Sequence, residues 1–164
     1  MSKLKYLGTY VSPLLALISF NCTGFFAYSG IIFLYVMVPI LENLIPKNNY
    51  NFSKEENKSA KHDWFYDWIL YLLVPIHLYV IYVFLITIAN PALELVDLIG
   101  HVLIMGTILG VNGINGGHEL GHKIDHPFKM LLARILLTTS FQNHFITYHN
   151  AGHHRDVATP NDLT

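Results

Sequence analysis

The sequence has few charged residues and almost no cysteine. Asp, Glu, Lys and Arg make up 13% of its 164 residues, whereas soluble domains carry about 25%. The formal net charge of −1, together with the lack of a basic arm or an RNA-binding motif, argues against a nucleic-acid partner. The single cysteine, Cys22, excludes an internal disulfide framework and a cysteine-based metal cage. The length favours one domain, which we place over residues 1–164.

Long apolar runs dominate the chain up to about residue 115. Apolar residues make up 52% of the sequence, and about 20 apolar helical residues cross a bilayer core. Apolar residues surround the predicted helices instead of forming one stripe, as expected in lipid. We therefore expect an all-α, polytopic membrane helical bundle of about four transmembrane helices, over residues 6–21, 25–45, 65–89 and 93–115. A cleaved signal peptide is the alternative for the first run, but a second run follows it almost at once.

Lysine and arginine fall on one predicted side of the membrane. They lie before the first predicted span, between the second and the third, and after the fourth, whereas the turns near Gly24 and Pro91 contain neither. The positive-inside rule makes the lysine-bearing side cytoplasmic. Because an even number of spans returns the chain to this side, we expect the histidine-rich region that follows to be cytoplasmic.

Histidine is the residue in excess, with ten copies, most of them after position 100. His118 and His122 are four residues apart, as are His149 and His153, and residues at this spacing are neighbours on one helix face. His154 adds a further imidazole. Five rings held this closely would repel one another if protonated, and a metal removes the repulsion because it binds neutral imidazole. We therefore predict that these five histidines are metal ligands and carry the chemistry.

The identity of the metal is less tightly constrained than the site. Imidazole-rich sites suit zinc, copper, iron or nickel. Residues 118–122 also fit the zinc-protease pattern H-E-x-x-H, in which Glu119 would be the general base. A zinc protease has no use for a second group of three histidines, which favours a two-metal site. Two irons can activate dioxygen, whereas zinc cannot change its oxidation state. An intramembrane zinc metalloprotease and a non-enzymatic metal-binding or transport protein stay open as alternatives.

Two histidine motifs resemble the first two histidine boxes of the membrane alkane 1-monooxygenases. They are HELGHK over residues 118–123 and HNAGHH over residues 149–154. The continuation V-A-T-P-x-D at residues 157–162 makes the match more specific than one to a generic fatty acyl desaturase or hydroxylase, which is the nearest alternative. The sequence departs from the family at Tyr148, where the family usually has Glu, and at Ala151, where it usually has Arg.

The resemblance implies a non-haem di-iron monooxygenase that uses O2 to hydroxylate the terminal carbon of alkanes or similar apolar chains. It also implies a rubredoxin-type electron donor and a bacterial-type inner membrane, with the histidine boxes on the cytoplasmic side. The ligands carried over by position are His118, His122, His149, His153 and His154. The family's third histidine box does not occur in these 164 residues, so we expect a truncated, amino-terminal desaturase/hydroxylase-like domain that is inactive on its own.

Other polar residues have weaker assignments. His77 and His101 lie inside predicted spans, and we interpret them as neutral donors in helix packing. His144 is expected to support the second box. Glu119 and Asp125 are candidates for orienting ligand imidazoles by accepting their second N–H.

The segment around the first box has its own structural signals. Its four glycines fit no phosphate-loop pattern and predict close helix packing in the membrane; they are Gly110, Gly113, Gly116 and Gly117. Residues 127–140 predict an amphipathic helix, since apolar residues recur at helical spacing, namely Phe128, Leu131, Leu132, Ile135 and Leu136.

Overall fold

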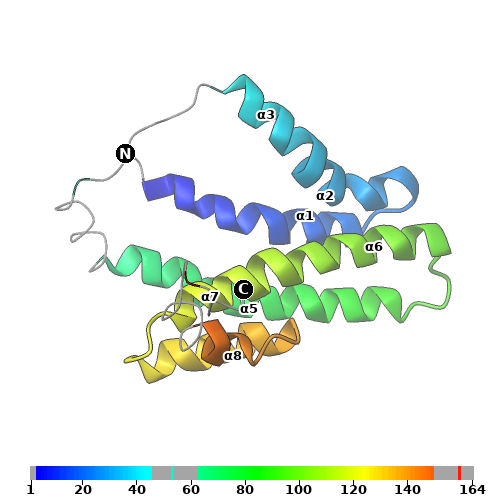
Figure 1. Cartoon of the computed structure of the whole chain (residues 1–164). Coiled ribbons are helices and arrows are strands. Elements are labelled where there is room, and N and C mark those ends of the chain that lie inside the picture. The colour runs from blue at the N-terminus through cyan, green and yellow to red at the C-terminus, as the bar shows by residue number, and fades with distance from the viewer. Residues whose placement is uncertain (1–2, 46–52, 54–62, 150–158, 160–164) are drawn as a thin grey trace. The chain divides into compact units, whose positions relative to one another are not determined.

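The computed structural model describes residues 3–45, 53, 63–149 and 159, and every regular element in these residues is a helix (Figure 1). The all-α expectation is therefore confirmed. The chain groups into two compact units, residues 1–108 and 109–164, which are described separately below.

Three helices are long and apolar enough to cross a membrane: Gly24–Leu44, Trp64–Ile88 and Leu95–Gly121. They confirm a multi-pass membrane bundle and agree with the second, third and fourth predicted spans. The first of these helices comprises η2 (Gly24–Tyr28), α2 (Ser29–Ile32), the π-helical η3 (Phe33–Met37) and α3 (Val38–Leu44). The second is α5 (Trp64–Ile88).

The third candidate span extends further than expected. It begins with α6 (Leu95–Ile108), continues through the π-helical η4 (Leu109–Asn115) and ends with α7 (Gly116–Gly121). The predicted span stopped at residue 115 because glycine, asparagine and histidine interrupt the apolar run there, although the backbone stays helical. His118 consequently lies within this helix and not in a segment after it.

The first predicted span, residues 6–21, is not among the three apolar helices. The structure forms a 3-10 helix, η1 (Lys3–Tyr10), followed by α1 (Val11–Phe20). Lys3 and Lys5 lower the apolar character of this segment. Its eight 3-10 residues and ten α-helical residues nevertheless extend about 31 Å, close to the roughly 30 Å of a hydrocarbon core.

This N-terminal segment packs against α5 along most of its length. The rings of Tyr6 and Tyr66 meet edge to face at 5.0 Å between centroids. The Tyr10 hydroxyl donates to the carbonyl oxygen of Ile69 at 2.8 Å. The rings of Phe20 and Phe84 are 5.5 Å apart. Because both residue numbers in these pairs rise together, the segment runs parallel to α5.

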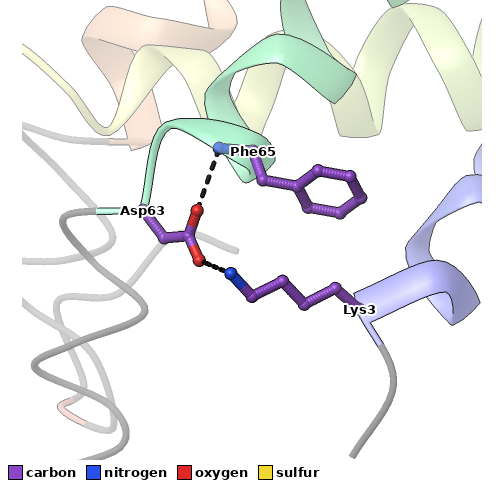
Figure 2. A network of polar contacts seen from close by, with 3 residues as sticks. All are labelled: Lys3, Asp63 and Phe65. Atoms are coloured by element: carbon purple, nitrogen blue, oxygen red, sulfur yellow. Dashed lines mark hydrogen bonds and ion pairs between the residues drawn. The ribbon is translucent and has the colours of Figure 1, made fainter.

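Polar contacts fix both ends of this segment. At its start, the Lys3 ammonium donates to the carboxylate of Asp63, which also accepts the Phe65 backbone N–H at 3.1 Å (Figure 2). Just beyond its end, the Gly24 backbone N–H donates to Asp97 in the first turn of α6 at 2.6 Å. The segment therefore runs from the beginning of α5 to the beginning of α6.

Two glycines allow the helices of the first unit to approach closely. A Cβ atom at Gly30 would lie 2.8 Å from Cδ1 of Ile104, and one at Gly100 would lie 3.0 Å from the carbonyl oxygen of Ala27. Both distances are too short for a larger residue without movement, so glycine permits α2 and η2 to pack on α6.

The second unit packs α8 (Pro127–Thr139) against α7 and η4. A Cβ atom at Gly117 would lie 2.7 Å from Cγ of Leu137 and 3.2 Å from the carbonyl oxygen of Ala133. Close packing is therefore confirmed at this glycine, but the prediction was wrong for Gly110, where an added Cβ atom would meet nothing within 4 Å. The Ser140 hydroxyl donates to the carbonyl oxygen of Leu109 at 2.9 Å, which joins the end of α8 to η4.

The predicted helix over residues 127–140 is confirmed as α8, but only part of its predicted apolar set packs inward. The structure buries Ala133, Leu136 and Leu137, whereas Phe128 and Leu131 remain 57% and 55% exposed. The helix is therefore apolar on two sides, since the face opposite its packing surface also carries large apolar side chains. Hydrophobic spacing alone does not show which of two apolar faces meets the neighbouring helix.

Candidate metal centre

Three histidines from two separate motifs come together in the second unit. They are His118 in α7, His122 directly after α7, and His149 directly after α9 (Phe145–Tyr148). One ring nitrogen from each lies within 4.8 Å of the other two. The rings of His118 and His149 are partly exposed and that of His122 is exposed. The other two predicted ligands, His153 and His154, lie outside the described residues.

The imidazoles of His118 and His122 are already in contact. Their Nε2 atoms are 2.6 Å apart, so one ring donates its N–H to the lone pair of the other. The His122 backbone N–H also donates to the His118 carbonyl oxygen at 3.2 Å. This bond continues the helix for one more residue and keeps both rings on one face. A cation at this point would take the place of the shared proton.

The third imidazole reaches the pair because α9 packs on a glycine of α7. A Cβ atom at Gly121 would lie 3.2 Å from Cγ1 of Ile146, so the lack of a side chain allows Ile146 to approach the helix. The His149 ring then lies 4.4 Å from that of His118 and 5.4 Å from that of His122, between centroids. The spacing of the motifs carries no signal for this contact, which depends on tertiary packing.

Phe145 is a neighbour of the site that sequence reasoning missed. Its ring stacks on His149 at 4.7 Å with an interplanar angle of 16°. It also meets His118 edge to face at 5.5 Å and 70°. The signal available in the sequence was an aromatic residue four positions before His149, on the same helical face.

The remaining candidates do not join the three histidines in the converging group. His144, Glu119 and Asp125 are exposed, and none belongs to the group of converging donors found among the described residues. His77 and His101 are buried in α5 and α6 of the first unit.

The donor set fits an iron ion. Neutral imidazole nitrogens bind iron, copper, zinc and nickel, and the described group contains three of them with no carboxylate. Three imidazoles do not fill the coordination of an iron ion, and the two other predicted ligands, His153 and His154, lie outside the described residues. The partial exposure of the rings leaves room for additional ligands.

Comparison with known proteins identifies relatives over most of the chain. No protein family model matches it. Alkane 1-monooxygenase 1 of Alcanivorax borkumensis is 29% identical over 153 residues, which are 92% of this chain and 37% of the relative. The alkane 1-monooxygenase of Pseudomonas putida is 30% identical over 169 residues, which cover 99% of this chain and 42% of the relative. The alkane 1-monooxygenase of Ectopseudomonas oleovorans is 31% identical over 153 residues, which cover 92% of this chain and 38% of the relative.

The chain thus spans about two fifths of the length of the curated relatives it matches. The similarity covers the membrane helices as well as the histidine motifs, since it includes almost the whole chain. Over almost its whole length, the chain is therefore similar to one part of the alkane 1-monooxygenases.

Proposed function

We propose that the protein is a non-haem di-iron monooxygenase that hydroxylates the terminal carbon of alkanes or similar apolar chains with O2. The observation that carries the proposal is the convergence of His118, His122 and His149 from two motifs, in a chain whose relatives are named alkane 1-monooxygenases. His153 and His154 would complete the ligands supplied by these motifs. A rubredoxin-type protein would deliver the electrons.

Each part of the chain has a distinct task in this proposal. The histidines hold the metal as neutral ligands, and α7, α8 and α9 keep their rings together. Iron, when bound, would supply the activation of dioxygen that C–H hydroxylation requires. The apolar span that ends with α7 would bring the site to a membrane in which an alkane dissolves, and so favours an apolar substrate over a polar one.

The arrangement of the first unit supports a cytoplasmic location for the histidines. Lys3 lies at the Asp63 end of the N-terminal segment, whereas the turn near Gly24 lies at the Asp97 end and contains no lysine or arginine. The positive-inside rule assigns the Lys3 end to the cytoplasm of a bacterial-type inner membrane. A span that starts beside Asp97 and crosses the bilayer returns the chain to that side.

Metal content tests the proposal directly. The chain is purified in detergent, and bound metals are measured for the unsubstituted protein and for H118A, H149A and H126A. His126 is an exposed histidine outside the group of three, so H126A is the matched control. We expect iron that is lost in H118A and H149A and kept in H126A. One zinc that survives H149A would contradict the proposal and favour the zinc-protease alternative.

Product analysis separates alkane hydroxylation from its nearest alternative. Five histidines do not complete the coordination of two irons, so we expect the 164-residue chain to bind metal without turning over. The whole protein, supplied with rubredoxin and its reductase, should convert an alkane to the 1-alcohol. A desaturated or internally hydroxylated fatty acyl product would instead identify a fatty acyl desaturase or hydroxylase.

A further inference from the structure

One aromatic side chain contacts two of the three converging histidines. The ring of Phe145 stacks on that of His149, with 4.7 Å between centroids and 16° between planes. The same ring presents an edge to His118 at 5.5 Å and 70°. Offset stacking and edge-to-face contact are the two favoured arrangements of aromatic pairs. A single side chain therefore restrains imidazoles that come from two different parts of the sequence.

We propose that Phe145 is a positioning residue of the metal centre, which fixes the ring plane of His149 and presents its nitrogen to the ion held by His118 and His122. This inference rests on the proposed function, because it assumes that these histidines bind metal. Phe145 acts only through the imidazoles and has no direct part in the chemistry.

A restraint of this kind is needed because the imidazole torsion is soft. The χ2 angle of histidine is broad and roughly two-fold, so the side chain alone does not select one ring plane. Metal sites generally fix it through an acceptor that hydrogen-bonds the second ring N–H, and loss of that partner typically costs 10–100-fold in affinity or activity. A flat ring stacked on His149 restricts the same torsion by shape.

The position of α9 makes the contact more important. The helix has four residues, far fewer than the roughly 12 that an isolated helix needs to be even marginally stable. Its place is therefore set by side-chain contacts, those of Ile146 with Gly121 and of Phe145 with the two histidines. Ile146 brings the helix close, and Phe145 determines how His149 is turned.

Stacking also favours the metal-bound state. An imidazole that gives its lone pair to a cation becomes electron-poor, and the face of a phenyl ring attracts positive charge. The contact between Phe145 and His149 is therefore stronger after metal binding than before it. This difference raises the metal affinity of the site, whereas a contact of equal strength in both states would not.

Three variants of the chain test the proposal. F145L keeps an apolar side chain but removes the flat ring, and F145Y keeps the ring. F141L is the matched control, because Phe141 is 89% exposed and lies in the turn before α9. Helix content measured by circular dichroism checks that each variant folds. The first readout is the affinity for Co(II), followed by its visible absorption bands, which report the geometry around the ion.

The second readout needs no metal. A stacked phenyl ring shifts the NMR signals of the imidazole beneath it, and H149A assigns the His149 signal in the histidine-labelled, metal-free chain. We expect F145L to lose this shift and to bind Co(II) about tenfold more weakly. F145Y and F141L should keep both the shift and the affinity of the unsubstituted chain.

The outcomes separate this inference from the proposed function. An unchanged His149 signal and unchanged Co(II) affinity in F145L would overturn the positioning role while leaving the metal site intact. Equal weakening by F145L and F145Y would also overturn it, because the ring plane would then not matter. If the unsubstituted chain binds neither iron nor Co(II), the proposed function fails, and the metal-free NMR signal still decides whether Phe145 orients His149.

Discussion

The Nε2 atom of His101 in α6 lies 2.9 Å from the carbonyl oxygen of Ser19, near the end of α1. The same nitrogen lies 3.3 Å from the carbonyl oxygen of Cys22, and the ring stands edge-on to Phe20. Carbonyl groups at a helix end have no partner within the helix, and the Ser19 carbonyl oxygen also accepts the Cys22 backbone N–H at 3.1 Å. A ring N–H of His101 adds a donor to both carbonyl groups and joins α6 to α1, in agreement with its expected role as a packing donor.

Leucine in place of His101 would remove this donor and leave the Ser19 carbonyl oxygen with the Cys22 N–H alone. We expect H101L to lower the free energy of unfolding by about 0.5–1.5 kcal/mol, the usual net contribution of one hydrogen bond. Reversible unfolding in mixed detergent measures this change. H126A, at the exposed position before α8, is the control. Equal stability of H101L and the unsubstituted chain would show that the contact does not stabilise the bundle.

The contact between Lys3 and Asp63 predicts a pH dependence. Hydrogen bonds from Lys3 and from the Phe65 N–H lower the pKa of Asp63 below its ordinary 3.8, and the bond to Asp63 raises the pKa of Lys3 above 10.5. A lowered carboxyl pKa stabilises the fold above pH 3.8, and this contribution is lost as the pH falls through the pKa of Asp63 in the folded state. A raised amine pKa stabilises the fold below pH 10.5, and this contribution is lost as the pH rises through the pKa of Lys3 in the folded state.

D63N isolates the charge in this contact. Asparagine also caps helices well, so the variant keeps an acceptor for the Phe65 N–H at the start of α5 and loses only the carboxylate. The pH dependence of thermal unfolding attributable to this pair should disappear in D63N, and the effect should be small because the Lys3 side chain is exposed to solvent, which screens the charge. Identical acid sensitivity of D63N and the unsubstituted chain would rule out the pair as its source.

Gly117 predicts a steric effect on the second unit. An added Cβ would meet Leu137 at 2.7 Å and the Ala133 carbonyl oxygen at 3.2 Å, so α8 would have to move. We expect G117A to cost about 1–3 kcal/mol of unfolding free energy, as overpacking usually does. The matched control is G106A, because a Cβ there meets nothing within 4 Å. Equal unfolding midpoints for the two variants would contradict tight packing of α8 on α7.

Gly121 predicts an effect on metal binding. Valine at this position would press against Ile146, whose Cγ1 already lies 3.2 Å from where a Cβ would stand. Displacement of α9 carries His149 away from His118, so we expect G121V to weaken Co(II) binding about tenfold. G110V is the control, since the space around that glycine is open. Retention of full affinity in G121V would mean that α9 does not depend on this contact to deliver His149.

The sequence predicts this fold well where the physics is local. Apolar runs place the membrane helices within one or two residues at most of their ends, as for residues 65–89 against Trp64–Ile88. They do not reveal that the helix continues through η4, because helical backbone persists where apolar composition stops. Nor do they reveal that η1 is a 3-10 helix, because its amino-acid composition would suit an α-helix equally well.

In the candidate site, too, only the local contact could be predicted from the sequence. The pairing of His118 with His122 follows from a spacing of four residues on one helix. The position of His149 beside His118 depends on the packing of Ile146 on Gly121. These two residues are far apart in sequence, and neither belongs to a metal-binding pattern. Phe145 is an ordinary apolar residue until its ring is seen against two imidazoles. Tertiary contacts of this kind cannot be inferred from motif spacing, and the assignment of the histidines as iron ligands stays a prediction.

The 3-10 geometry of η1 separates the length of the N-terminal segment from its residue count. Conversion of its eight residues to α-helical geometry would shorten the segment by about 4 Å without changing its composition. Natural bilayers differ in thickness by a similar amount, and each ångström of mismatch costs a fraction of a kcal/mol. In a segment that crosses a bilayer, such a change in backbone hydrogen bonding is sufficient to match a thinner membrane, without tilting or sliding of the helix.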